Sequence, residues 1–182
     1  EILDIVAGFP GALSLLPRPS ASGAAAPGEP DYYSAQTWEA LKGRNRDRWF
    51  GGQIGARPQQ AMLDRARSVW DALLADDKVA EPVERIAYVF GQGEQTPCGL
   101  AQADGRLQLL FTSEGDGSVT WQSGRLDNLP EGERCWYMPV EHSDLTGTAE
   151  YFPAILDLLT SGSTSRLDRL PRTRGAAVQP VV

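Results

Sequence analysis

Apolar residues recur at three- and four-residue spacings between residues 57 and 77, with charged residues on the opposite side. This spacing predicts an amphipathic helix with Pro58 in its first turn. Shorter stripes predict helices at residues 1–7, ended by the glycines and proline of GFPG, and after Ser34, which suits a helix cap. Residues 17–30 are rich in Pro, Gly, Ala and Ser, and we expect them to form a flexible loop.

The pattern changes after residue 84 to short apolar runs of the kind that form β-strands. These runs are RIAYVFGQ (85–92), RLQLLFTS (106–113) and RCWYMPV (134–140). The first is almost continuously apolar, which favours a strand covered on both faces in a mainly parallel α/β sheet. The segment GEQTPCGLAQADG between the first two is broken by glycine and proline, and it predicts a loop leading into a hairpin.

A last apolar run predicts a helix from about Thr148 to Thr160, with Gly162 in the position of a C-terminal stop. Pro153 moves the expected start towards Phe152, because proline is tolerated only in the first turn. The remaining tail has no periodicity and reads as a terminus or linker.

Together these elements predict three regions. A helical region spans residues 1–80, the strands and last helix of an α/β core span 81–170, and the tail spans 171–182. Three short strands separated by long loops can bury little apolar area against one another. In addition, an almost continuously apolar strand needs neighbours on both sides. We therefore expect an α/β fold that forms the C-terminal part of a larger sheet, whose other strands belong to an upstream segment.

The composition of the chain limits the classes of partner that it is expected to bind. The chain has 182 residues, 41% of them hydrophobic, and a net charge of −7, which argues against a general affinity for nucleic acid or anionic membranes. No apolar run is long enough to span a bilayer, and the start EILDIVAGFPG lacks the basic region of a signal peptide. A cytoplasmic protein that is not transmembrane is expected, with its true N-terminus upstream of Glu1.

The cysteines and acidic residues predict no metal or cofactor site. Cys98 and Cys135 have no CxxC spacing, so we expect two buried thiols rather than a zinc site or a disulfide. Glu141 and Asp144 flank His142, but one imidazole without a second histidine or cysteine at ligand spacing makes a poor zinc site.

Two side chains that can carry acid–base chemistry follow predicted strands. Asp116 lies between Gly115 and Gly117 after the second strand, and His142, the only histidine, follows the third. If these strands are neighbours, both side chains emerge at the same carboxyl edge of the sheet. A buried aspartate that accepts the Nδ1 proton of a histidine fixes its tautomer for general base catalysis. The alternative is that Asp116 only forms a tight turn and His142 only caps a loop.

The order of these motifs resembles the C-terminal portion of α/β-hydrolases of the lecithin:cholesterol acyltransferase-like group, including related bacterial hydrolase domains. The resemblance covers residues 82–167 and rests on RIAYVFGQGEQTP, LLFTSEGDGSV, WYMPVEHSDL and YFPAILDLLTSGSTSRL. It implies that Asp116 is the acid and His142 the base of a catalytic triad. It also implies that the helical region 1–80 is a cap or lid and that the last helix closes the core. Asp-Gly-Ser-Val and His-Ser-Asp-Leu depart mildly from the Asp-Gly-Thr-Val and His-Gly-Asp-Leu of many members.

The nucleophile is the larger departure from this family. No Gly-x-Ser-x-Gly elbow occurs in the chain, and none of the serines upstream of Asp116 has flanking glycines after a strand. We therefore expect the serine and the oxyanion donors on the upstream segment, and the 182 residues alone to be inactive. The complete protein would act as a lipase- or esterase-like hydrolase, or as an acyltransferase.

The expected substrate is an acyl ester or lipid-like molecule under a cap formed by residues 9–76. The apolar residues of this region that suit such a substrate, or that simply pack a small helical subdomain, are Phe9, Leu13, Leu15, Leu16, Tyr32, Tyr33, Trp38, Trp49 and Phe50. Two other readings stay open. The chain could be a non-catalytic interaction module of a larger multidomain protein, or an independent small α/β binding domain.

Overall fold

The computed structural model describes residues 2–17, 30–41, 57–75, 83–103, 106–125, 129, 134–171 and 179–180. The chain divides into two compact units. One comprises residues 1–77 and 100–108, and the other comprises residues 78–99 and 109–182. Residues 100–108, predicted to belong with the C-terminal strands, group with the first unit. Most of the predicted loop at 17–30, together with Trp49 and Phe50, lies outside the described residues.

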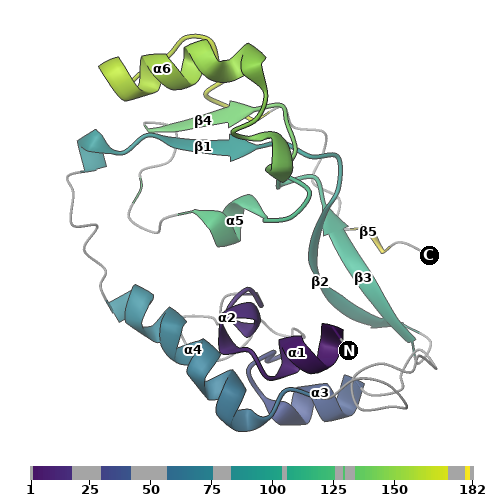
Figure 1. The fold of residues 1–182 in the computed structure, drawn as a ribbon. Coiled ribbons are helices and arrows are strands. Elements are labelled where there is room, and N and C mark those ends of the chain that lie inside the picture. The colour runs from purple at the N-terminus through teal and green to yellow at the C-terminus, as the bar shows by residue number, and fades with distance from the viewer. Residues whose placement is uncertain are drawn as a thin grey trace. The chain divides into compact units, whose positions relative to one another are not determined.

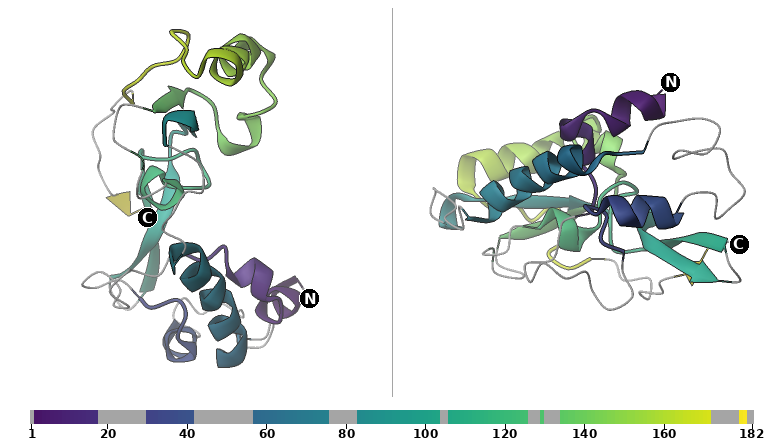
Figure 2. Two further views of the ribbon diagram at one scale, coloured as in Figure 1. Left: turned by 90° about the vertical axis from the view of Figure 1, so that its left-hand side faces the viewer. Right: turned by 90° about the horizontal axis from the view of Figure 1, so that it is seen from below.

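The first unit contains the helices α1 (Ile2–Ala7), α2 (Pro10–Leu13), α3 (Ala35–Leu41) and α4 (Gln60–Ala75). The helices predicted at residues 1–7, after Ser34 and between residues 57 and 77 are confirmed. Pro10, predicted as a helix breaker, opens α2 because its fixed φ suits the first helical position. Helix α2 packs against α4 (Figures 1 and 2).

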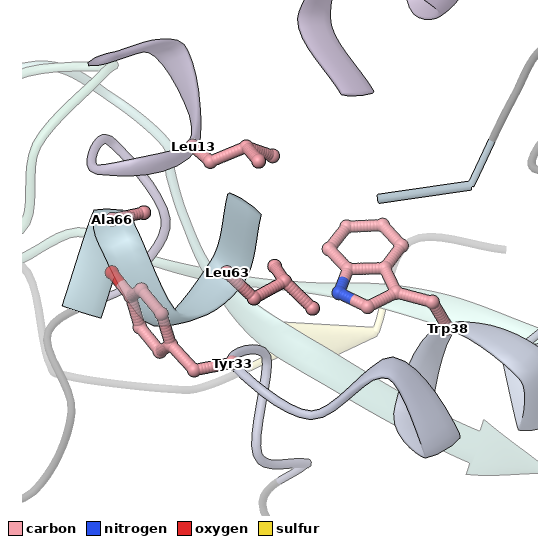
Figure 3. Close-up of a cluster of buried hydrophobic side chains, with 5 residues drawn as sticks. All are labelled: Leu13, Tyr33, Trp38, Leu63 and Ala66. Atoms are coloured by element: carbon pink, nitrogen blue, oxygen red, sulfur yellow. The ribbon is translucent and has the colours of Figure 1, made fainter. Parts of the chain in front are cut away.

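The core of the first unit is a small cluster of buried side chains contributed by α2, α3, α4 and the turn before α3. Figure 3 shows its members, Leu13, Tyr33, Trp38, Leu63 and Ala66. The Trp38 ring nitrogen donates a hydrogen bond to the Tyr32 carbonyl at 2.8 Å. The Trp70 ring nitrogen likewise donates to the Ser14 carbonyl at 3.0 Å, which ties α4 to the end of α2.

The second unit is built on two parallel strands, β1 (Tyr88–Gly91) and β4 (Cys135–Met138), with Tyr88 opposite Cys135. Alternate residues of each strand face opposite sides. Val89, Trp136 and Met138 pack with helix α6 (Phe152–Ser161), whereas Tyr88, Phe90, Cys135 and Tyr137 pack with Leu129 and with Trp121 of α5 (Trp121–Gly124). Figure 1 shows the strand pair between α6 and α5.

Helix α6 confirms the helix predicted from about Thr148 to Thr160. It begins at Phe152, has proline in its first turn, and is preceded by the 3₁₀ turn η3 (Ala149–Tyr151). Gly162 takes the left-handed conformation with φ +70° and donates its N–H to the Leu158 carbonyl, so the predicted stop is also confirmed. Arg134 donates to the carbonyls of Ile86 and Gly162, which fixes the start of β4.

A second sheet has the strand order β2 (Thr96–Ala103), β3 (Arg106–Thr112), β5 (Gln179–Pro180). The segment predicted as a loop before the hairpin is therefore largely strand β2. Its proline is the second residue of the strand, where a missing N–H is tolerated at an edge. Residues 179–180, predicted as unstructured tail, pair antiparallel with Leu110 and Phe111.

The three predicted strands all form, but not in one sheet. Among the described residues, β3 pairs with β2 and β5, while β1 pairs with β4. The fold is thus loosely α/β, with helices and small sheets that contain both parallel and antiparallel pairs. No helix in the described part of the chain combines the length and the apolar character needed to cross a membrane.

Candidate functional site

Asp116 occupies a tight turn between β3 and α5. Its Oδ1 accepts hydrogen bonds from the main-chain N–H groups of Ser118 at 3.0 Å and Val119 at 2.7 Å, and its own N–H donates to the Val119 carbonyl. Gly117 has φ +91°, a conformation that side chains disfavour, so the turn requires glycine there. The aspartate thereby folds its own turn with one oxygen and leaves the other available.

His142 begins the 3₁₀ turn η2 (His142–Asp144) after β4. Its Nδ1 lies 2.8 Å from Oδ2 of Asp116, and its main-chain N–H donates to the Asp116 carbonyl at 2.8 Å. The Asp116 residue is 7% exposed, whereas the His142 side chain is 53% exposed. The two residues singled out from the sequence are therefore brought into direct contact, with a buried acid and a half-exposed ring.

The route by which they meet differs from the expected one. The strands before Asp116 and His142, β3 and β4, are not neighbours among the described strands. The end of β1 connects their loops instead, because the Gln92 N–H donates to the Val140 carbonyl and the Gly93 N–H donates to the Gly115 carbonyl. A Cβ at Gly91 would lie 2.7 Å from the Asp116 Cβ, so a glycine is needed for this close approach.

Burial and hydrogen bonding shift the pKa of Asp116 in opposite directions. Burial alone would raise the pKa of Asp116, but the Val119 N–H, His142 and the Ser118 N–H stabilise the carboxylate and together hold its pKa below the ordinary value of 3.8. Asp116 therefore faces His142 as a carboxylate at neutral pH.

This geometry sets up general base chemistry at the outer nitrogen of the ring. A carboxylate at Nδ1 favours the tautomer in which Nδ1 carries the proton and Nε2 has a free lone pair. Among the described residues, Asp116 is the single side chain that hydrogen-bonds to the ring. A hydroxyl placed at Nε2 could donate its proton to the imidazole, and the imidazolium so formed would be stabilised by Asp116.

Among the described residues, no hydroxyl or thiol forms a hydrogen bond with the ring of His142. The hydroxyls of Ser14 and Ser68 in the first unit bond to carbonyls of their own helical turns, and Ser20 and Ser22 lie outside the described residues. Within the described ranges, no three His, Cys, Asp or Glu side chains are grouped to hold a metal ion. Cys135 is buried, as expected, whereas Cys98 is only half-buried.

Two residues that hold the turn or the end of β1 beside it were not predicted from the sequence. Thr96 is fully buried, and its Oγ1 accepts the Gly117 N–H at 2.9 Å. The Trp121 ring nitrogen donates to the Gly91 carbonyl at 2.8 Å, and its ring packs edge-on against Tyr137. Thr96 was missed because residues 93–105 read as a loop. The available signal was a β-branched residue directly before proline, which favours extended backbone.

Comparison of the chain with protein-family models, with curated proteins and with solved structures finds no match.

Proposed function

We propose that this chain supplies the acid and the base, Asp116 and His142, of a serine acyl hydrolase or acyltransferase of the α/β-hydrolase type. The nucleophilic serine would lie on an upstream segment of the same protein. The observation that carries this proposal is the 2.8 Å contact between Nδ1 of His142 and Oδ2 of a buried aspartate. Further support comes from the motif order, which resembles that of the lecithin:cholesterol acyltransferase-like group.

In the proposed reaction, the serine Oγ attacks the acyl carbonyl carbon while its proton passes to Nε2 of His142. Asp116 stabilises the imidazolium and holds the ring in place. The imidazolium then gives the proton to the leaving alkoxide, which leaves an acyl-serine. Water or another alcohol next attacks the acyl-serine with His142 again as base, and the proton returns to the serine as the acyl product departs. Oxyanion donors would come from the upstream segment.

An apolar acyl group is the proposed substrate feature, and residues 9–76 remain the segment expected to contact it. Among the cap residues expected to contact it, Phe9 is 60% and Leu15 is 85% exposed. In contrast, Leu13, Tyr32, Tyr33 and Trp38 are buried, and Leu13, Tyr33 and Trp38 belong to the core cluster of the unit. Phe9 and Leu15 are therefore the better candidates for contact with the substrate, because exposed apolar side chains can bury further area on binding.

A second candidate is a non-catalytic interaction module that has kept the Asp116 turn but lost hydrolase activity. It is compatible with the observation that no described hydroxyl or thiol hydrogen-bonds to the ring of His142, which the catalytic proposal also accommodates by placing the serine upstream. The upstream sequence discriminates between the two candidates. A Gly-x-Ser-x-Gly motif after a strand favours catalysis, and its absence favours the module.

Covalent labelling tests the catalytic proposal. In the protein extended by its upstream segment, a fluorophosphonate probe should label one serine, and His142→Ala should slow this labelling by roughly 10²–10⁴-fold, the usual contribution of a general base. Ser143→Ala, which removes an exposed neighbouring hydroxyl, is the matched control and should label at the wild-type rate. Full labelling of His142→Ala would contradict the role of His142, and no labelling of the wild type would favour the interaction module.

A further inference from the structure

We propose that Thr96 is a positioning residue that holds the Asp116 turn so that Oδ2 faces Nδ1 of His142. The positioning itself is argued from the geometry of the turn. Its importance for catalysis rests on the proposed function. Thr96 is the first residue of β2, is fully buried, and accepts the Gly117 N–H on its Oγ1 at 2.9 Å.

The turn is held on both sides of Asp116 by the segment that leads into β2. On one side, the Gly93 N–H donates to the Gly115 carbonyl at 2.8 Å. On the other side, Gly117 donates to Thr96. Asp116 therefore lies between two hydrogen bonds that anchor its flanking glycines to residues 93–96.

The glycines of the turn also pack closely against Thr96 and Gly93. A Cβ at Gly115 would lie 2.5 Å from Oγ1 and 2.7 Å from Cγ2 of Thr96, and a Cβ at Gly93 would lie 2.7 Å from the Gly117 nitrogen. The threonine side chain thus fills the space directly beside the turn, and a Cβ added at Gly115 would clash with it. Its methyl and hydroxyl groups have separate effects, since one fills space and the other fixes a main-chain N–H.

Thr96 differs from the other groups that hold the turn. Among the described residues, it is the one side chain of another element that hydrogen-bonds to the main chain of residues 115–117. The remaining bonds of the turn are made by main-chain groups or by Asp116 itself. A substitution at Thr96 can therefore alter the orientation of Asp116 without removing any group of the Asp116–His142 pair.

The single histidine makes this inference measurable in the 182-residue chain, because ¹⁵N-histidine labelling gives one pair of ring signals. Thr96→Val keeps the shape but removes the hydroxyl, and it should shift the tautomer ratio of His142 towards the Nε2–H form by about fivefold, the equilibrium effect of one lost hydrogen bond. Thr96→Ser keeps the hydroxyl and should restore the wild-type ratio. Thr160→Val, which removes an exposed hydroxyl on α6, is the control and should leave the ring signals unchanged.

A wild-type tautomer ratio in folded Thr96→Val would overturn the proposal. Should that variant not fold, the exchange of the Gly117 N–H with solvent decides the matter. Protection in the wild type and in Thr96→Ser supports the bond to Thr96, and exchange at the rate of an unprotected amide overturns it. Neither readout depends on a serine nucleophile, so failure of fluorophosphonate labelling would count against the proposed function alone.

Discussion

At the scale of single residues, Asp116 combines two tasks in one carboxyl group. One oxygen accepts the N–H groups of Ser118 and Val119 and forms the turn, while the other meets the ring of His142. Because these bonds favour the charged form, they offset the cost of burying a carboxylate. The same residue is therefore a structural group and a candidate catalytic group, and an acid titration can separate it from an ordinary turn aspartate.

Acid should destabilise the second unit through Asp116. Its folded-state pKa lies below the ordinary value of 3.8, so the resulting stability is present above pH 3.8 and is lost as the pH falls through the lowered value. Asp116→Asn has no carboxyl to titrate. In urea titrations between about pH 5 and pH 2, the free energy of unfolding of the wild type should fall more steeply than that of Asp116→Asn.

Asp144→Asn, which removes an exposed carboxylate two residues from His142, serves as the control and should follow the wild type. If the free energy of unfolding fell equally steeply with pH in the wild type and in Asp116→Asn, the lowered pKa of Asp116 would be contradicted.

At the scale of elements, the site depends on how closely the end of β1 approaches the two loops. Gly91→Ala would place a Cβ 2.7 Å from the Asp116 Cβ and 2.8 Å from the Val140 carbonyl oxygen, so one loop or both must move. We expect this variant to lose about 1–3 kcal/mol of unfolding free energy, as overpacking usually does.

Gly147→Ala provides the matched control, because a Cβ there has no neighbour within 4 Å and Gly147 is not among the described glycines with positive φ. Its unfolding free energy should stay within about 0.5 kcal/mol of the wild type. Urea titrations of the three proteins check both values. A stability of Gly91→Ala equal to that of Gly147→Ala would contradict the close approach of β1 to the acid.

Elements with a strong local signal could be predicted from the sequence. Periodic apolar spacing located α4 and α6, and Gly162 marked the end of α6, because these features depend on residues within a few positions of one another. Strand β2 escaped prediction because Pro97 and Gly99 weaken the strand pattern, and its place in the sheet comes from pairing with β3.

At the scale of the whole chain, sheet membership was the feature that the sequence could not determine. Three strands were expected side by side, yet β1 pairs with β4, while β3 pairs with β2 and with two residues near the C-terminus. Such pairings join distant parts of the chain, and no local pattern encodes them. The meeting of Asp116 and His142 was nevertheless anticipated, because both follow strands. The expected reason, that these two strands are neighbours, was wrong for the described strands, and the end of β1 links their loops instead.

The proposed chemistry depends on Asp116 orienting His142 so that Nε2 is free to take a proton. The ¹⁵N ring spectrum of the wild-type chain tests this most directly, with Asp116→Asn as comparison, at a pH where the imidazole is neutral. We expect Nδ1 to carry the proton in the wild type and Nε2 to carry it in Asp116→Asn, where an amide can turn its N–H₂ towards Nδ1. A wild-type ring protonated at Nε2, or one with the same tautomer ratio as Asp116→Asn, would contradict this expectation.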